Sequence, residues 1–419
     1  MRRLSLIAAS ALSLAAGTAL VACGGSSEVS ITPPTPLPSV APTLTREVIS
    51  VPGGLSAPWD LAFLPDGSML ITERCSGLSI VRDGTRTRLF GTAGSRTVAA
   101  DFVCEGQSGM LGVAVDPEFG SANRFVYVFM ASNATAPRRN RVLRLTLAAD
   151  LLSVNGRTDI VDDIAFKDAG NAHGGAGAHS GGRIRFGIAA SDRYLYVGTG
   201  DNHDGTLPQR PIAPLGGKVL RVTRDGAAAP GNGAPGGFDA RVFTYGHRNV
   251  QGIAFRPGGG QPFIAEHGPN HSDEVTALVA GGNGGWDPRD RPGLACPDGY
   301  CGYAGNATTM PMTDTARFPD AMRPSWTNDG SSQGLGPATF LSGAQWKAWD
   351  GRLAVGVMAG QRIEILTLDG AGFASGHANT TATATNGSLS ARIRSLVQGP
   401  DGNLYVLTDS SQLWRIVPG

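Results

Sequence analysis

The sequence predicts an all-β protein built as a six-bladed β-propeller of four-stranded antiparallel sheets. Sixty glycines and 27 prolines in 419 residues, with only 16% charged residues, favour short strands joined by many turns. A hairpin pattern recurs six times from residue 46 onward, and no long window shows helical periodicity. A β-sandwich or a pair of separate β-domains is the alternative architecture.

Each repeat consists of two alternating, β-branched or aromatic-rich runs around a Gly/Asp turn, which predicts a β-hairpin. The first turns at Pro65-Asp66-Gly67, the second has a longer loop, the fifth is the weakest and the last is the cleanest. The repeats cover residues 58–74, 109–130, 181–201, 252–268, 336–360 and 394–417. Their spacing of about 60 residues suits four-stranded blades that bury their faces against neighbouring blades. Loops from all blades of a propeller meet at one end of its channel, so distant residues can line one pocket.

The chain begins with a targeting segment rather than a folded element. Residues 1–22 combine two arginines with a long apolar run of mostly small residues, as in a signal peptide. The run ends in LVAC, which resembles the bacterial lipoprotein box and makes Cys23 the expected lipidation site; an ordinary secretory signal is the alternative. Residues 23–45 are rich in Gly, Ser, Pro and Thr and predict a tether, so the propeller is expected over residues 46–419. We therefore expect an exported lipoprotein, on the periplasmic side or on the outer membrane, whose membrane contact is the lipid anchor alone.

The net charge bears on the kind of partner, and the cysteine content bears on disulfides and metal sites. A formal net charge of +1 without any Lys/Arg run argues against a nucleic-acid partner. Four cysteines remain in the folded part, and an even number in an exported protein suggests two disulfides. Proximity favours Cys296–Cys301, which leaves Cys75–Cys104. No CxxC pair occurs, which disfavours a cysteine metal site.

Histidines concentrate in the middle of the chain. None has the HExxH spacing of a zinc hydrolase, and any one of them alone could be structural. Six of the seven are His173, His179, His203, His247, His267 and His271.

Four glycine-containing stretches place polar residues beside predicted strands. EGQSGMLGVAVDP holds Gln107, and AHSGGRIRF holds His179. TYGHRNVQGIAF holds Arg248 and Asn249 between a strand end and the next apolar run. FIAEHGPNHSDEV follows a strand with a Gly-Pro-Asn turn and then two acidic residues.

Together these stretches resemble the soluble quinoprotein glucose/sorbosone dehydrogenase family, whose members use pyrroloquinoline quinone on a six-bladed propeller. The resemblance spans about residues 51–417 in the family's motif order, and the combination of GHRNxQG with EHGPNxxDE is the specific part. It implies an enzyme that oxidises an aldose to the lactone and passes electrons to an unidentified acceptor.

The resemblance also implies individual roles. His179 is expected to be the general base that takes the proton of the sugar's anomeric hydroxyl, with the surrounding glycines leaving room for cofactor and sugar. Arg248 and Asn249 correspond to cofactor contacts, and the guanidinium would stabilise charge on the reduced ring. Gln107 corresponds to a residue that contacts both sugar and cofactor. Each of these could instead be an ordinary loop residue.

Calcium and a further arginine pair belong to the same expectation. The carbonyls of Gly268 and Pro269 correspond to ligands of a calcium ion that also grips the cofactor, and Glu274 to a carboxylate at a second, structural calcium. Arg392 and Arg394 match an RxR pair on the cofactor carboxylates, and alternate residues of a strand share a face. A solvated turn for Glu274 and a surface stripe for the arginines are the alternatives.

Three departures weaken a glucose-specific interpretation. Ala178 stands where glucose dehydrogenases have an aspartate, and the expected cofactor lysine is missing from the fifth repeat, where only Gln361 and Arg362 are nearby. Trp326 is an inexact counterpart of the sugar-pocket tryptophan. The pattern fits the broader aldose-dehydrogenase branch better. A calcium-dependent propeller lactonase or hydrolase and a non-catalytic propeller that binds a glycan or protein remain the competing hypotheses.

Overall fold

The structure is a computed structural model, and it describes residues 39–168, 174–296, 299–302, 310–328, 330–380, 385 and 387–419. The predicted signal peptide, the lipidation site Cys23 and most of the predicted tether lie outside the described residues. Within the described part, no helix has the length and apolarity that crossing a membrane requires.

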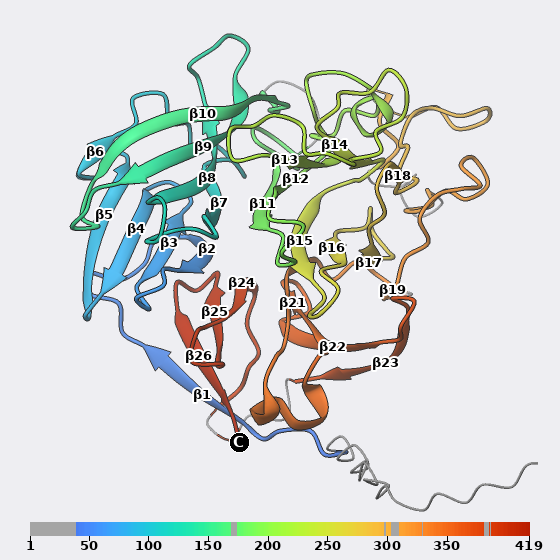
Figure 1. Cartoon of the computed structure of the whole chain (residues 1–419). Coiled ribbons are helices and arrows are strands. Elements are labelled where there is room, and N and C mark those ends of the chain that lie inside the picture. Colours follow the sequence, from blue (N-terminus) through green and yellow to red (C-terminus); the bar gives the residue numbers. More distant parts are fainter. Residues whose placement is uncertain are drawn as a thin grey trace, which may run out of the picture. The chain divides into compact units, whose positions relative to one another are not determined.

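Strands of the described residues form six small sheets around a common centre, so the predicted six-bladed β-propeller is confirmed (Figure 1). Blade 1 contains β2 (Pro58–Phe63), β3 (Met69–Glu73), β4 (Gly77–Arg82), β5 (Thr85–Gly91) and β6 (Thr97–Val98). Blade 2 contains β7 (Met110–Val115), β8 (Phe125–Ser132), β9 (Arg139–Leu147) and β10 (Val154–Ile164). Blade 3 contains β11 (Gly181–Phe186), β12 (Leu195–Thr199), β13 (Lys218–Val222), β14 (Val242–Tyr245) and β18 (Gly282–Asn283).

The remaining blades follow the same order from the centre outward. Blade 4 contains β15 (Val250–Phe255), β16 (Pro262–Glu266), β17 (Glu274–Ala277) and β19 (Trp326–Thr327). Blade 5 contains β20 (Leu335–Phe340), β21 (Leu353–Val357), β22 (Arg362–Leu368) and β23 (Ala374–Asn379). Blade 6 contains β24 (Ile393–Gln398), β25 (Leu404–Thr408), β26 (Leu413–Pro418) and, from the start of the chain, β1 (Leu44–Ile49).

Two of the six sheets differ from the predicted four-stranded antiparallel form. Blades 1 and 3 each have a fifth strand of two residues, β6 and β18, which pairs parallel to its neighbour. The fifth repeat looked weakest in the sequence because the 3-10 segment η4 (Ala344–Trp349) separates β20 from β21. Another 3-10 segment, η1 (Leu207–Gln209), lies between β12 and β13.

Each predicted repeat contains the two innermost strands of a blade, the last repeat also contains β26, and the innermost strands form a ring. β2 contacts β7 and β24, and the ring continues through β11, β15 and β20. Because neighbouring blades cover both faces of a sheet, several strands are buried along their whole length instead of alternating. The LAVGV sequence of β21 is buried at all five positions.

Asp60 on β2 ties the inner strands of four blades together. Its carboxylate pairs with Arg183 and Arg185 of β11, and it accepts hydrogen bonds from the Ser395 hydroxyl of β24 and the Val113 amide of β7. Burial raises the pKa of Asp60, but the two guanidiniums outweigh burial and lower it overall. The carboxylate is therefore charged, and it fixes the ring from which the site loops project.

The propeller is closed by the N-terminal strand. β1 pairs antiparallel with β26, from Leu44 opposite Pro418 to Ile49 opposite Leu413. The strand therefore starts two residues before the predicted domain start at residue 46. This pairing joins the two ends of the propeller, because a strand from the beginning of the chain completes the last blade.

Both predicted disulfides are present. Cys75–Cys104 has a Cα–Cα distance of 5.2 Å and links the turn after β3 to the loop that carries Gln107. Cys296–Cys301, with a Cα–Cα distance of 5.0 Å, closes a loop that also carries Tyr300. Each disulfide thus stabilises a loop next to the site described below.

Candidate functional site

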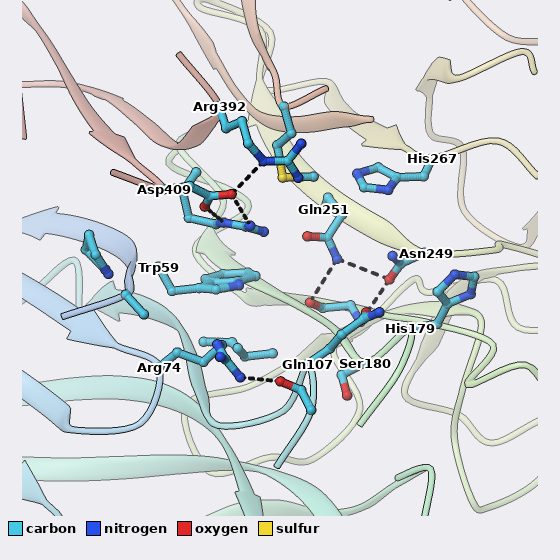
Figure 2. Close-up of a pocket in the computed structure, with 17 residues that line it drawn as sticks. Trp59, Arg74, Gln107, His179, Ser180, Asn249, Gln251, His267, Arg392 and Asp409 are labelled. Atoms are coloured by element: carbon cyan, nitrogen blue, oxygen red, sulfur yellow. Dashed lines mark hydrogen bonds and ion pairs between the residues drawn. The ribbon is translucent and has the colours of Figure 1, made fainter. Parts of the chain in front are cut away.

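A cavity of about 560 Å³ lies where the starts of several inner strands meet, and Figure 2 shows the side chains around it. Five of the residues singled out in the sequence line it, and each precedes or begins an inner strand: Gln107, His179, Asn249, Arg392 and Arg394. The ring of inner strands therefore brings together residues that are nearly 300 positions apart in the chain.

His179 is held by a carboxylate from the neighbouring strand. Its Nδ1 lies 2.7 Å from Oδ1 of Asp201, just beyond the end of β12. Burial and the charge of Arg248 lower the pKa of His179 well below 6.5, so the ring is neutral near pH 7. With the proton on Nδ1 and donated to Asp201, the lone pair is on Nε2, and this nitrogen can accept a proton.

Asp201 is completely buried and is fixed by several donors. Besides His179, it accepts hydrogen bonds from the His203 backbone amide at 3.0 Å, from Nε1 of Trp286 at 2.8 Å and from the Tyr300 hydroxyl at 2.8 Å. These donors, together with His179, hold the Asp201 carboxylate in one orientation. Ala178, which replaces the aspartate expected before the histidine, is buried and supplies no charge.

Glycines next to His179 are required by protein packing. A Cβ added at Gly177 would lie 2.3 Å from Cβ of Ser108, and one at Gly181 would lie 2.6 Å from the Thr199 backbone. Both glycines also have a positive φ, +64° and +68°. The room that we attributed to an approaching cofactor is, at these two positions, filled by the Gln107 loop and by β12.

Asn249 and Gln251 join the entrance of β15 to that of β11. Oδ1 of Asn249 accepts hydrogen bonds from the Gly181 amide and from Nε2 of Gln251, both at 3.1 Å. Gln251 also donates to the Gly181 carbonyl at 3.2 Å. The cavity wall between blades 3 and 4 is thus built from fixed amide groups, as the dashed lines in Figure 2 show.

Arg248 does not line the cavity, although the motif suggested a direct cofactor contact. It is 5% exposed, and Nη1 donates to the His267 carbonyl at 3.0 Å. Its Nε is buried and has no hydrogen-bond partner among the described residues. His267 itself lines the cavity, so Arg248 lies behind the cavity wall. From there its positive charge contributes to the lowered pKa of His179.

Arg392 and Arg394 both line the cavity and share one carboxylate. Nε of each lies within 2.9 Å of an Asp409 oxygen, and Nη2 of Arg394 makes a further contact at 3.0 Å. Only Arg394 lies in β24, because the strand begins at Ile393, so the argument from strand alternation was wrong for Arg392. The surface-stripe alternative is excluded by their place in the cavity wall.

None of the residues assigned to calcium by resemblance lines the cavity. Gly268 and Pro269 are buried, and their carbonyls accept no hydrogen bond from any described residue, while the Gly268 amide donates to Asp273. Glu274 is 5% exposed, which excludes a solvated turn. Burial and the nearby Glu266 raise the pKa of Glu274 to about 8.

Several lining residues were missed in the sequence. Four of them share one position, directly after the second strand of a hairpin: Arg74 after β3, His267 after β16, Met358 after β21 and Asp409 after β25. Aligning the six repeats on their second strands would have revealed this series. Trp326 does not line the cavity; the tryptophan that does is Trp59 of β2.

Comparison with known proteins agrees with this architecture. An aldose sugar dehydrogenase of Escherichia coli (strain K12) is 28% identical over 379 residues, covering 87% of this chain and 91% of the relative. Quinoprotein glucose dehydrogenase B of Acinetobacter calcoaceticus is 27% identical over 320 residues, covering 70% of this chain and 62% of the relative. The apo-form crystal structure of the soluble aldose sugar dehydrogenase of Escherichia coli superposes with a TM-score of 0.68 at 25% identity, covering 90% of this chain and all of that one.

The family match covers most of the propeller. The model of the glucose/sorbosone dehydrogenase family matches residues 55–415, from the approach to β2 through most of β26. The matched segment includes every cavity residue named above and both disulfides. This chain belongs to the glucose/sorbosone dehydrogenase family.

Proposed function

We propose that this protein oxidises an aldose at its anomeric hydroxyl to the lactone, with pyrroloquinoline quinone as cofactor and His179 as general base. The observation that carries the proposal is the placement of a neutral, carboxylate-bound His179 in the same cavity as Arg392 and Arg394. A base for the sugar and cations for an acidic cofactor then lie around one space. The quinoprotein among the relatives supports the choice of cofactor.

The cavity residues fit pyrroloquinoline quinone, a flat tricarboxylic acid. Arg74, Arg392 and Arg394 outnumber the single carboxylate of Asp409, so the wall has an excess of positive charge for an anionic ligand. The volume of about 560 Å³ is in the usual range of pockets for small molecules. Nε2 of His267 is buried in this wall without a partner among the described residues, which leaves a polar atom for a ligand to satisfy.

When bound, the quinone accepts a hydride equivalent from the sugar carbon. The protein's own part is the proton: Nε2 of His179 takes it from the anomeric hydroxyl, because the other ring nitrogen is already engaged with Asp201. Asp201 stabilises the imidazolium that results. Arg392 and Arg394 hold the anionic part of the cofactor, and the amides of Asn249 and Gln251 define the wall beside His179.

Reconstitution tests the proposed function. Purified protein given calcium and pyrroloquinoline quinone is expected to show the absorbance of bound quinone and to reduce an artificial dye with an aldose. A panel of aldoses then identifies the preferred sugar. Absence of both quinone absorbance and dye reduction would contradict the proposal; lactone hydrolysis without quinone would favour the lactonase, and glycan binding without either reaction would favour a binding propeller.

We also propose that the chain binds one calcium ion through the carbonyls of Gly268 and Pro269 and a second, structural calcium ion through Glu274. These are the hard oxygen donors that calcium prefers, and the two carbonyls are buried without donors. Calcium at a hundredfold excess over its Kd is expected to raise the free energy of unfolding by about 2.7 kcal/mol, because it binds only the folded chain. Thermal denaturation of the chelator-treated protein with and without calcium measures the effect.

The matched variants for this prediction are E274Q and E364Q. Glu364 is another buried carboxylate, but it pairs with Arg362 and His377 on blade 5. E274Q is expected to reduce the calcium-dependent rise in Tm, whereas E364Q lowers Tm and leaves the rise unchanged. An unchanged calcium response in E274Q would show that Glu274 is no ligand.

A further inference from the structure

The cavity contains one guanidinium that no motif assigned. Arg74 follows β3 directly, next to the Cys75–Cys104 disulfide, and lines the cavity with Trp59 and Gln107. In the view of Figure 2 it lies on the side of Trp59 opposite to Arg392 and Asp409. Arg74 is partly exposed, so its guanidinium is accessible from the cavity.

Arg74 differs from the other cavity arginines in making no ion-pair contact with a described acidic residue, although the charges of Arg394 and Asp409 are near enough to influence its pKa. Arg392 and Arg394 both pair with Asp409, whereas Arg74 forms no ion pair with any described residue. Its Nη1 donates to the carbonyls of Gly106 and Ser108, the latter at 3.1 Å. Nε and Nη2 donate to no described residue, so three N–H groups on two nitrogens of a permanently charged group remain available.

Blade 5 contributes no positively charged side chain to the cavity wall. The position after β21, which corresponds to that of Arg74 after β3, is Met358, and it brings no charge into the cavity. Arg362, the nearby cation, pairs with Glu364 and does not line the cavity. Blade 1, which contacts blade 6 through β2 and β24, is therefore the source of the third positive charge.

We propose that Arg74 is a further cofactor-binding residue, whose guanidinium pairs with a quinone carboxylate that lies away from Arg392 and Arg394. The inference rests on the proposed function, since it needs an anionic cofactor in this cavity. A guanidinium with an open edge matches the geometry of a carboxylate and forms charge-assisted hydrogen bonds with it. Binding across Trp59 would then use charges from two adjacent blades.

A purely structural role is the competing explanation, because Arg74 also clamps the Gln107 loop. Two substitutions separate the roles. R74Q keeps an amide that can donate to the Gly106 carbonyl but removes the charge. R74K keeps the charge but loses the planar fork. A cofactor role predicts that affinity follows the charge, whereas a clamp role predicts that both variants behave alike.

Equilibrium titration of the calcium-loaded full chain with pyrroloquinoline quinone, followed by absorbance without sugar, gives the Kd. R74Q is expected to bind the quinone about 10- to 100-fold more weakly than the wild type, and R74K to lie closer to the wild type than to R74Q. The control is R88Q, because Arg88 also clamps a turn, through Ser76 and Thr92, but does not line the cavity. R88Q is expected to leave the Kd unchanged.

The other outcomes overturn the inference in distinguishable ways. Unchanged affinity in R74Q would show that Arg74 does not touch the quinone. Equal weakening in R74Q and R74K, together with a lowered Tm in both, would assign Arg74 to the loop alone. Failure of the wild type itself to bind the quinone would contradict the proposed function, and this inference with it.

Discussion

Replacement of His179 by glutamine is expected to lower kcat for aldose oxidation by about 10²- to 10⁴-fold, with quinone affinity retained. The loss is that of a positioned general base, because glutamine has no nitrogen that accepts a proton near neutral pH. His179 is buried beside Asp201, so its removal leaves Arg392 and Arg394 in place for the cofactor. Steady-state kinetics at saturating quinone, together with a quinone titration, measure both quantities.

The backbone at His179 calls for a second variant. Its φ of +48° lies in the left-handed region, which asparagine tolerates better than glutamine. H179N should therefore fold as well as the wild type, and its kcat should be lowered as much as that of H179Q. H377Q is the control, because His377 lies on the outer strand β23 and is largely exposed. Loss of quinone binding in both His179 variants, with an intact Tm, would give His179 a binding role instead.

The pH profile of the wild type follows from the same environment. Burial and Arg248 place the pKa of His179 well below 6.5, and the neutral ring is the active form. kcat/KM is therefore expected to fall only in acid and to be constant from pH 6.5 towards neutrality. An acid limb centred above pH 6.5 would show that another group is the base.

Replacement of Asp201 by asparagine is expected to have a comparably large effect, lowering kcat on the order of 10³-fold without preventing quinone binding. Asparagine can donate from its amide to Nδ1 of His179, which moves the ring proton to Nε2 and blocks proton uptake there. In this orientation the amide oxygen still accepts from Trp286 and Tyr300, but the new NH2 group faces the donating backbone amide of His203. Asp201 is thus a positioning residue that acts through His179.

Two measurements distinguish positioning from a structural role. Loss of the negative charge removes stabilisation of the imidazolium, so the acid limb of the residual activity should move to lower pH. D192N is the matched control, because Asp192 lies at the other end of the same blade and accepts from Arg221 and Tyr196. D192N should change stability without moving the limb; an unmoved limb in D201N as well, with kcat near wild type, would exclude positioning.

The sequence predicted the fold in detail because its signals are local. Each hairpin is specified by a short stretch of sequence with its own turn residues, such as Pro65-Asp66-Gly67 between β2 and β3. The prediction was weakest where a local insertion, η4, interrupts the run between β20 and β21. The fifth strands β6 and β18 escaped notice, because two-residue parallel pairings leave no periodicity to read.

The sequence motifs predicted only some of the residues that line the cavity. Gln107, His179 and Asn249 line the cavity as their motifs suggested, and Arg248, from one of the same motifs, does not. A motif specifies that a residue is near the site, but which side of a wall its long side chain takes depends on neighbours such as His267. Arg248 Nη1 bonds the His267 carbonyl, and that contact turns the guanidinium away from the cavity.

By itself, the sequence determined that this chain is a propeller of six hairpin-centred blades, with two disulfides and a set of polar residues at the strand entrances. Only the tertiary structure decided which carboxylate holds His179, which arginines share Asp409 and which strand closes the ring. The physical reason is range. Turns and strand alternation arise between adjacent residues. By contrast, the 2.7 Å hydrogen bond between His179, before β11, and Asp201, after β12, or the pairing of Leu44 with Pro418, exists only after the chain has folded.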